Sequence, residues 1–424
     1  MRRNPLNPFL ALGALAMSCA AAQPSGGGVV DAVAMAASAP DRCIAPLTYI
    51  ALDAALVGQD DHGMAALGTY ERVSPDGRFV LRSFSGALLG KVSLIELPAQ
   101  GGQAIRTYRT PFSNEAFPVQ NTWRYLVDVN GEHYRFKDVL TRQAAAHALF
   151  RAGMTGFYAA AAEMQAVPSA ADDPKTDPPQ RQQQRVFIRS LSWPQNVDPD
   201  LQGIGPLQIE DIEVLDDGAA AQPVRKTGSQ FICQQRKVTD GGVYALPMIA
   251  VDGSAFSAIP QVPRQGQPSM RVYSLAAQPM ARQQPCELRA DLGFAPGKAV
   301  FGYASAAGQS AWLTYSDFGT VYVFDPQLRQ TWPMDNQRHG VLASAFPALT
   351  RDGRVIYGAT WRNCADARRC PAVAGYVVAD PYQSTAYRTY WKTRNQTPAK
   401  TCITQADVLK ERDAFARFHG LDTP

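Results

Sequence analysis

The chain has 424 residues, of which 41 are Lys or Arg and 37 are Asp or Glu, so the formal net charge is +4. Because this charge is near neutral and the basic residues are scattered, the sequence argues against nucleic acid as a partner. Hydrophobic residues make up 46% of the chain, which is typical of a globular protein, and the length suits one closed repeat fold.

Residues 1–22 have the pattern of a secretory signal peptide. Arg2 and Arg3 precede an apolar stretch at 9–17 that is too short to span a bilayer. We predict cleavage after a run of small residues that ends at position 22. The alternative is a lipoprotein signal in which Cys19 carries a lipid anchor, although the Leu that usually stands three residues earlier is absent. Both interpretations predict export to the periplasm or outer envelope, and no later segment predicts a transmembrane span.

Residues 23–42 are rich in Ala, Ser, Gly and Pro, a composition typical of a flexible leader. From about residue 44 the chain has β signals. Four short runs are separated by turn residues such as those at 74–77; the runs are 68–73, 79–84, 91–97 and 105–110. Four antiparallel strands in series make one blade of a β-propeller.

A turn, a basic residue and a β-rich run recur along the chain at a fixed distance. Gly297 and Gly353 occupy the same place in this phrase and lie 56 positions apart. In each four-stranded repeat the second strand is expected to begin near one of these residues: Phe79, Trp123, Val186, Val243, Ala299 and Val355. We therefore predict an all-β fold, a six-bladed β-propeller of four-stranded antiparallel blades over residues 43–402. A seventh blade is the alternative if residues 44–66 pair with the C-terminal region.

Residues 141–184 interrupt the repeat. The Ala-rich part at 141–166 predicts one or two helices, and the Pro- and Gln-rich part at 167–184 predicts a loop, so we expect a helical insertion. In the last blade, residues 385–391 are expected to form the closing strand. Residues 403–424 are expected to hold a C-terminal helix at 405–419.

Six cysteines remain after Cys19, and an even number in an exported chain predicts disulfides. They are Cys43, Cys233, Cys286, Cys364, Cys370 and Cys402. Cys364 and Cys370 flank one apparent hairpin loop and are the pair that we favour first. Cys43 with Cys402 would tie the two ends of the ring together. No Cys-x-x-Cys pair occurs and no His lies near these cysteines, so we expect no metal site and no cofactor.

The phrase Ser74-Pro75-Asp76-Gly77-Arg78, followed by an apolar strand, resembles the repeat of TolB-like propellers, also called the PD40 or WD40-like repeat. The segment 346–354 is similar to it, with Arg351 in place of Pro. This resemblance implies a propeller fold and a periplasmic protein that docks onto partners in cell-envelope assemblies. Asp76 and Asp352 are interpreted as turn formers within this repeat.

Two sets of acidic residues are candidates for chemistry. Asp325 and Asp380 each end a strand before a Pro, and they could line a channel mouth, bind a cation or cleave a glycoside. We favour a turn-forming role for both. A second set could hold calcium, but we favour a solvated edge; it comprises Glu210, Asp211, Glu213, Asp216 and Asp217.

Aromatic residues crowd the last blade, where most are expected to fill the core. They include Trp361, Tyr376, Tyr382, Tyr387, Tyr390 and Trp391. The remainder could form a docking surface. We take five residues as candidate binding residues: Asp325, Asp380, Trp361, Tyr382 and Trp391.

The five histidines show no metal-ligand spacing, and no nucleophile elbow or phosphate loop occurs, so no catalytic residue is assigned. The function that we favour is a non-enzymatic, exported scaffold that binds an envelope protein or polysaccharide. The alternative is a glycoside or ester hydrolase with carboxylates at the mouth of the propeller channel.

Overall fold

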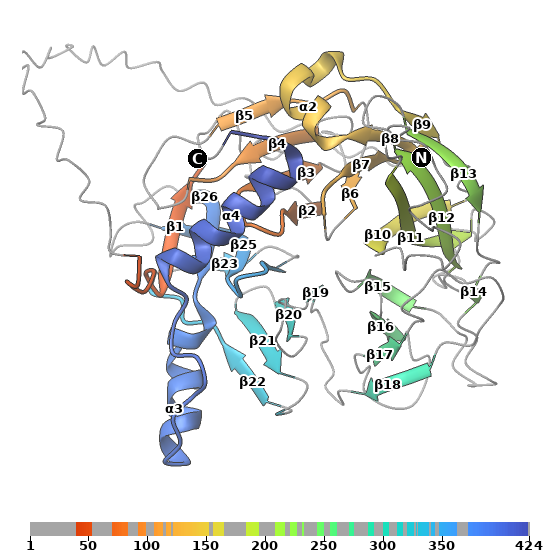
Figure 1. Cartoon of the computed structure of the whole chain (residues 1–424). Coiled ribbons are helices and arrows are strands. Elements are labelled where there is room, and N and C mark those ends of the chain that lie inside the picture. The colour runs from red at the N-terminus through yellow and green to blue at the C-terminus, as the bar shows by residue number, and fades with distance from the viewer. Residues whose placement is uncertain are drawn as a thin grey trace, which may run out of the picture. The chain divides into compact units, whose positions relative to one another are not determined.

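The computed structural model of the protein describes residues 40–52, 70–83, 92–98, 106–112, 116–119, 122–151, 156–164, 184–194, 208–216, 221–226, 231–232, 244–249, 255–260, 271–274, 287–291, 300–304, 312–316, 320–325, 328, 330–338, 341–343, 347–362 and 372–422. Strands dominate these residues and form antiparallel sheets of consecutive hairpins (Figure 1).

The first three sheets follow one another along the chain. The first contains β2 (Tyr70–Val73), β3 (Phe79–Ser83), β4 (Val92–Glu96) and β5 (Arg106–Arg109). The second contains β6 (Ala116–Pro118), β7 (Tyr125–Asp128), β8 (Glu132–Arg135) and β9 (Phe150–Arg151). The third contains β10 (Gly156–Met164), β11 (Gln184–Pro194), β12 (Gln208–Asp216) and β13 (Ala221–Lys226), with β14 (Phe231–Ile232) also paired to β12.

The remaining sheets repeat this order. The fourth contains β15 (Tyr244–Ile249), β16 (Ala255–Pro260), β17 (Arg271–Ser274) and β18 (Glu287–Asp291). The fifth contains β19 (Val300–Ala304), β20 (Trp312–Ser316), β21 (Val321–Asp325) and β22 (Gln330–Pro333). The sixth contains β23 (Leu342–Ala343), β24 (Ala348–Leu349), β25 (Val355–Arg362) and β26 (Ala372–Ala379). The prediction of four-stranded antiparallel sheets in series is confirmed. The second strands expected near Val243 and Ala299 are wrong, because β15 and β19 are the first strands of the fourth and fifth sheets.

The sixth sheet is completed by a strand from the other end of the chain. β1 (Leu47–Ala51) pairs antiparallel with β26, from Leu47 opposite Ala379 to Ala51 opposite Gly375. The predicted pairing of residues 44–66 with the C-terminal region is therefore observed at β1, where it adds an edge strand to an existing sheet and builds no seventh sheet from the described residues. Successive sheets touch through β3 and β6, β6 and β10, β10 and β15, β15 and β19, β19 and β24, and finally β24 and β2. This architecture is of the propeller type.

The predicted turn role of the repeat phrase is confirmed at atomic detail. The Asp76 carboxylate accepts hydrogen bonds from the Ser74 hydroxyl at 2.5 Å and from the Arg78 backbone N–H at 3.1 Å. Asp352 accepts the equivalent bonds from the Thr350 hydroxyl and the Arg354 backbone N–H. The glycine that follows each Asp has φ of +71° or +98°, a region that glycine enters without strain.

Two predicted elements are wrong. Residues 156–164 form β10, paired along its length with β11, where a helix was expected. Alanine favours helices, but the cross-strand pairing outweighs that weak preference. Among the described residues of this region, the helical part consists of α2 (Phe136–Arg142) and the short η2 (Gln143–Ala145), and residues 152–155 and 165–183 lie outside the described residues. The expected closing strand at 385–391 is a helix, α3 (Thr385–Thr393), which follows η3 (Pro381–Gln383).

The predicted C-terminal helix is confirmed as α4 (Gln405–His419). Thr404 and Asp407 form a capping box at its start, and Gly420 ends it in a left-handed conformation. α4 passes over residues of the first two sheets. Phe415 packs on Phe79 and Phe136, and the His419 ring Nε2 lies 2.8 Å from the Thr122 carbonyl oxygen. In the part of the chain that the structure describes, no helix is both long enough and apolar enough to cross a membrane.

Candidate functional site

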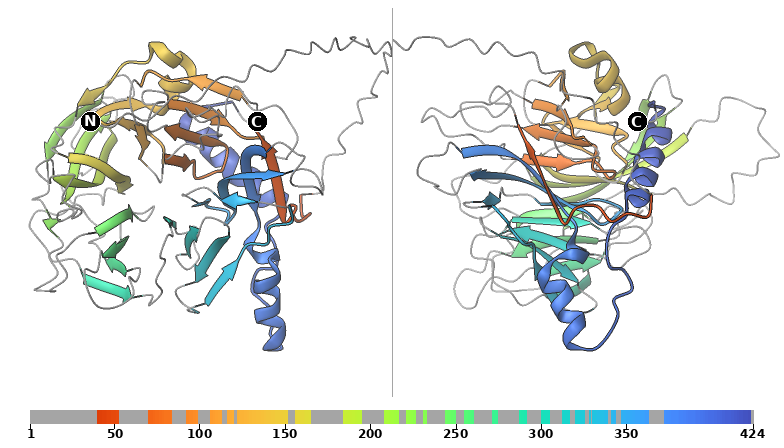
Figure 2. Two further views of the ribbon diagram at one scale, coloured as in Figure 1. Left: turned by 180° about the vertical axis from the view of Figure 1, so that it is seen from behind. Right: turned by 90° about the vertical axis from the view of Figure 1, so that its left-hand side faces the viewer.

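The candidate site is a segment that we call the α3 arm, residues 380–404, which contains η3 and α3 and returns to the start of α4. In Figures 1 and 2 α3 extends away from the strands of the sixth sheet. The arm gathers three of the five predicted binding residues, namely Asp380, Tyr382 and Trp391.

Asp380 fixes the base of the arm. Its carboxylate accepts hydrogen bonds from the Tyr382 backbone N–H at 3.0 Å, the Gln383 side-chain amide at 2.6 Å and the Ile403 backbone N–H at 2.7 Å. One side chain thus holds together the two segments at the base of the arm, the one that leaves the sixth sheet and the one that returns to α4. Burial raises the pKa of Asp380, although these hydrogen bonds and Lys400 act in the opposite direction. This geometry is that of a turn and a clamp, the role favoured from the sequence.

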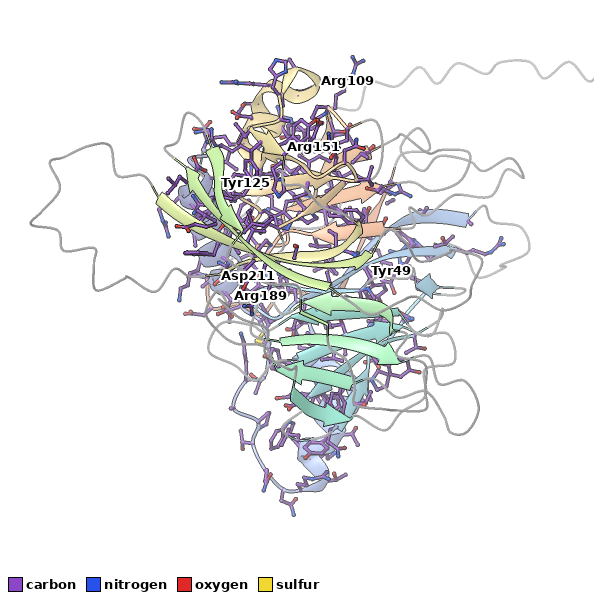
Figure 3. All side chains as sticks on the ribbon, turned by 90° about the vertical axis from the view of Figure 1, so that its right-hand side faces the viewer. Tyr49, Arg109, Tyr125, Arg151, Arg189 and Asp211 are labelled. Atoms are coloured by element: carbon purple, nitrogen blue, oxygen red, sulfur yellow. A yellow bond between two sulfur atoms is a disulfide. The ribbon has the colours of Figure 1, made fainter. Side chains whose placement is uncertain are left out.

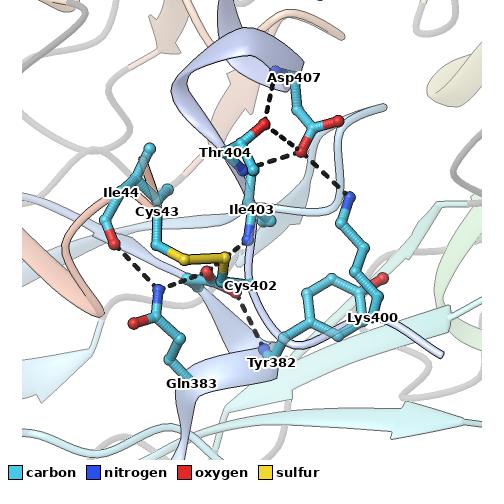
Figure 4. Close-up of a disulfide and its surroundings, with 10 residues drawn as sticks. Cys43, Ile44, Tyr382, Gln383, Lys400, Cys402, Ile403, Thr404 and Asp407 are labelled. Atoms are coloured by element: carbon cyan, nitrogen blue, oxygen red, sulfur yellow. Dashed lines mark hydrogen bonds and ion pairs between the residues drawn. A yellow bond between two sulfur atoms is a disulfide. The ribbon is translucent and has the colours of Figure 1, made fainter. Parts of the chain in front are cut away.

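A disulfide closes the same base. Cys43 and Cys402 are bonded, as the sequence analysis proposed for the pair that would join the chain ends (Figure 4). Residues 43 and 404 also form a backbone bridge, and the Gln383 side chain donates to the Ile44 carbonyl oxygen at 2.9 Å. Lys400 lies over the Tyr382 ring and 3.6 Å from the Asp407 carboxylate. Because the arm is tied at both ends, its helix is held in a fixed place.

One face of α3 is aromatic and packs on the protein. Tyr387, Tyr390 and Trp391 follow the i, i+3, i+4 spacing of a helix face. Trp332 of β22 meets the rings of Tyr387 and Tyr390 edge-on, with centroids 5.2 and 5.9 Å apart. An isolated helix of nine residues is only marginally stable in water, so the packing of these aromatic side chains on Trp332 stabilises α3.

The opposite face of α3 is exposed and basic. Arg388 and Lys392 are exposed one turn apart, and exposed Arg394 follows at the helix end. The Arg394 guanidinium lies 3.7 Å from the centre of the half-buried Tyr390 ring. From Ser384 to Thr404 the sequence holds four basic residues and no Asp or Glu. This surface can pair with anions and offers aromatic rings beside them.

Trp361 and Asp325 lie in the neighbouring core. Trp361 of β25 is 1% exposed and meets Tyr49 edge-on at 5.3 Å, and Tyr382 is buried in the same apolar cluster. The Asp325 carboxylate accepts a hydrogen bond from the Leu328 backbone N–H at 3.0 Å, as a turn residue does. Burial raises the pKa of Tyr387, and Asp325 and Asp380 add to this effect, so both carboxylates act on one hydroxyl. A binding role for these residues stays a prediction.

The acidic set at 210–217 is not a solvated edge, and that expectation is wrong for two of its members. Asp211 is buried and forms a two-pronged ion pair with Arg189, with both N···O distances at 2.8 Å (Figure 3). Asp216 is buried and accepts hydrogen bonds from the Tyr125 hydroxyl and from Arg135. Asp211 and Asp216 are five positions apart on β12, so their side chains point to opposite faces of the sheet. They link strands and sheets.

Some candidates cannot be placed. Asp217, Cys19, Cys233, Cys286, Cys364 and Cys370 lie outside the described residues, so the other predicted disulfides remain predictions. Among the residues that are described, no group of three or more His, Cys, Asp and Glu side chains could hold a metal ion.

Comparisons with known proteins give distant likenesses in structure alone. No protein-family profile matches the chain, and no curated protein matches it. Similar solved structures include regucalcin, a calcium-binding protein from Agrobacterium tumefaciens, with 10% identity, 80% of this chain and 97% of that chain covered, and a TM-score of 0.38. A gluconolactonase from Xanthomonas campestris shares 12% identity over 80% and 98% of the chains, with a TM-score of 0.36.

An oligogalacturonate lyase from Vibrio parahaemolyticus shares 9% identity over 76% and 90% of the chains, with a TM-score of 0.35. Likenesses of this strength assign neither a family nor an activity to this chain. The TolB-like resemblance is likewise not matched by any of these comparisons, whereas the propeller-type arrangement of the sheets agrees with it.

Sequence reasoning missed the basic residues Arg388, Lys392 and Arg394. Two signals in the sequence could have revealed them. One is the run from 384 to 404 without an acidic residue, and the other is the aromatic spacing at 387, 390 and 391, which has helical period.

Proposed function

We propose that this protein is an exported, six-bladed and closed β-propeller that acts as a binding scaffold, and that the α3 arm is its binding surface. Closure is inferred from the sixth sheet, where β24 contacts β2 of the first sheet and β1 pairs with β26. Export to the periplasm or outer envelope is supported by the signal-like N-terminus and by a disulfide, a bond that persists in oxidising compartments. A lipid on Cys19 stays the alternative to cleavage.

The observation that carries the proposal is the construction of the α3 arm. A rigid platform with aromatic side chains and a few charged groups is typical of a recognition surface. The arm has aromatic packing on one face, a disulfide and the Asp380 clamp at its base, and exposed cations on its outer face. A loop that only connected the sixth sheet to α4 would not need these features, which hold a basic helix in a fixed place. The partner class is an envelope protein, as the TolB-like resemblance implies, or an envelope polysaccharide.

The second candidate is a glycoside or ester hydrolase with Asp325 and Asp380 at a channel mouth. The similar solved structures include a gluconolactonase and an oligogalacturonate lyase, which are enzymes. The hydrogen bonds of Asp380, however, are directed to the base of the arm, and Asp325 bonds to its own turn. Neither carboxylate is therefore placed as a free acid or base, and the scaffold is the function that we prefer.

Photo-crosslinking from the arm tests the proposal. A photoreactive residue replaces Thr389, which is exposed between Arg388 and Lys392, or Lys410 on the exposed side of α4 as the matched control. Each protein is irradiated in envelope extract, and its products are identified by mass spectrometry. We expect one partner to be crosslinked from position 389, to be lost in the variant R388E/K392E, and to be absent from position 410.

The hydrolase alternative is measured on the same preparations with a panel of glycosides, lactones and esters. Turnover that D325N or D380N abolishes, combined with no arm-dependent crosslink, would reverse the assignment. Crosslinks of equal yield from positions 389 and 410 would also contradict the proposed role of the arm.

A further inference from the structure

We infer that the exposed face of α3 binds an acidic polysaccharide, with sugar carboxylates paired to Arg388 and Lys392. This inference rests on the proposed role of the α3 arm as a binding surface. It adds the chemical class of the ligand and the residues that contact it.

The first observation is an unfavourable charge pair within α3. Arg388 and Lys392 stand at i and i+4, and like charges at that spacing destabilise a helix by a few tenths of a kcal/mol. In the part of the chain that the structure describes, neither side chain forms a salt bridge that would offset this repulsion. Lys392 and Arg394 stabilise the C-terminal end of the helix dipole, but Arg388 lies too early in the helix to do so. An external anion would relieve the repulsion.

The second observation concerns the surroundings of this pair. The segment from Ser384 to Thr404 has no acidic residue. Lys400, in the segment that returns from α3 to α4, is already paired with Asp407. The Asp335 carboxylate accepts a hydrogen bond from the Thr385 backbone N–H at 2.8 Å at the start of α3, whereas the charged side chains of the arm's own outer face are all basic. A helix rises about 1.5 Å per residue, so the two charges lie roughly 6 Å apart along the axis. A linear polymer with one carboxylate on every sugar presents anions at a regular spacing and can contact both.

The third observation is the Tyr390–Arg394 stack beside the charges. The Arg394 guanidinium carbon lies over the Tyr390 ring, 3.7 Å from its centre, and Nη1 of Arg394 donates to the Tyr390 carbonyl oxygen at 3.1 Å. A guanidinium held in this way keeps its orientation, so it loses little entropy when a carboxylate binds in its plane. Tyr390 adds an aromatic body with a polar end, which suits the mixed apolar and hydroxyl surface of a sugar ring.

The same face argues against a membrane as the ligand. Membrane-surface helices insert large apolar side chains beside their basic residues. Among the described residues, the exposed large hydrophobic side chains are Leu328, Leu409 and Phe418, none of which lies on α3. Tyr387 is buried and Tyr390 and Trp391 are only partly exposed, so no large aromatic side chain of α3 projects far enough to insert into a bilayer. An acidic peptide would match the charges, but it offers no regular ring for the Tyr390–Arg394 stack, so we favour the polysaccharide.

Direct binding measurements test the inference. The full chain is titrated by isothermal calorimetry with alginate, a linear polymer with a carboxylate on every sugar, and with neutral dextran. Poly-glutamate and vesicles that contain phosphatidylglycerol represent the acidic peptide and the membrane. We expect alginate to bind with an affinity that falls as salt is raised, R388E/K392E to weaken it at least tenfold, and dextran to show no binding.

The matched control is K410E/R417E, which makes the same charge change at exposed positions of α4. It should bind alginate within twofold of the wild type, and thermal melts should show that both variants are folded. Equal losses in the two variants, or tighter binding of poly-glutamate or vesicles than of alginate, would overturn the inference. If alginate does not bind while the crosslink from position 389 persists, this inference fails and the proposed scaffold function stands.

Discussion

Two buried histidines respond to pH in the same direction. Burial lowers the pKa of His133 and of His419 to about 4, and hydrogen bonds to the Gly131 and Thr122 carbonyl oxygens only partly oppose this. In the unfolded chain both groups titrate near 6.5. Between pH 6.5 and 4 the unfolded state therefore binds more protons than the folded state, and stability falls as pH falls. The burial of each ring thus stabilises the fold most at neutral pH.

The variant H419Q should show this effect for one residue. Glutamine can still donate a hydrogen bond to Thr122 but does not titrate, so the variant should lose about 3 kcal/mol less stability than the wild type between pH 7 and pH 4. Urea unfolding followed by tryptophan fluorescence at several pH values measures the difference. The control is H147Q, because His147 is exposed. If H419Q and H147Q lose stability in parallel with the wild type, the explanation is wrong.

Buried carboxylic acids change the stability with pH in the opposite direction to the histidines, so the wild type must be compared with the histidine variant. Burial raises the pKa of Asp76 and, with smaller contributions from neighbouring carboxylates, that of Glu411. A carboxyl whose folded pKa is raised binds its proton more tightly in the folded state, so its contribution to stability falls as pH rises. The pH dependence of the wild type's unfolding free energy is therefore the sum of contributions from histidines and acids. The difference between H419Q and the wild type isolates the contribution of His419.

At the scale of elements, the two repeat turns contact each other across neighbouring sheets. Arg354 donates to the Asp76 carbonyl oxygen at 2.6 Å, and the Arg351 backbone N–H donates to the Pro75 carbonyl oxygen at 2.9 Å. Arg354 also forms a buried ion pair with Asp352. The repeat phrase thus shapes its own turn and joins the first sheet to the sixth.

Gly77 and Gly353 occupy equivalent turn positions but have different space around them. A Cβ at Gly77 would lie 2.9 Å from Ile356 and from Arg354, whereas at Gly353 the nearest atom, on Tyr382, is 3.5 Å away. Both G77A and G353A place a side chain at positive φ, which costs about 1–2 kcal/mol. Overpacking should add about 1–3 kcal/mol to G77A alone. Urea unfolding of the two variants measures this, and equal losses would show that the two turns do not pack as described.

Strands with polar turns were predictable, and elements held by tertiary contacts were not. Residues 79–84 and 91–97 are short β-rich runs bounded by turn residues, so β3 and β4 could be located from local pattern. β10 could not, because a run of alanines carries no strand period and depends on β11 for its pairing. α3 was mistaken for a strand because its aromatic residues favour strands, while its Ser384 cap and its packing on Trp332 favour the helix.

The candidate site was predicted in part for the same reason. The aromatic crowding and the Asp-Pro turn at Asp380 mark the arm in the sequence, and the pairing of Cys43 with Cys402 follows from the need to join the chain ends. The exposed face of α3 becomes visible only when the helix is known, because only then do Arg388 and Lys392 stand on one face. The ion pair of Arg189 with Asp211 depends on the register of β11 and β12.

For the whole molecule, the first and last described strands are joined at one place by two independent means. β1 pairs with β26, and the Cys43–Cys402 disulfide spans 359 residues of sequence beside it. In the chain-entropy account, a crosslink that closes so long a loop stabilises the folded state by about 6 kcal/mol. The variant C43S/C402S should therefore unfold at a lower urea concentration than the wild type.

Substitution at Gly375 separates the strand from the disulfide. A Cβ at Gly375 would lie 2.0 Å from the Ile50 carbonyl oxygen and 2.6 Å from the Trp361 ring, so G375V should displace β1 from β26, with some repacking of Trp361, and leave both cysteines in place. Hydrogen exchange at residues 47–51 should then rise in G375V, and a reducing agent should destabilise it further, whereas C43S/C402S should be insensitive to reduction at this pair. If C43S/C402S matches the wild type in stability and in exchange at 47–51, strand pairing alone joins the ends, and the disulfide contributes nothing to closure.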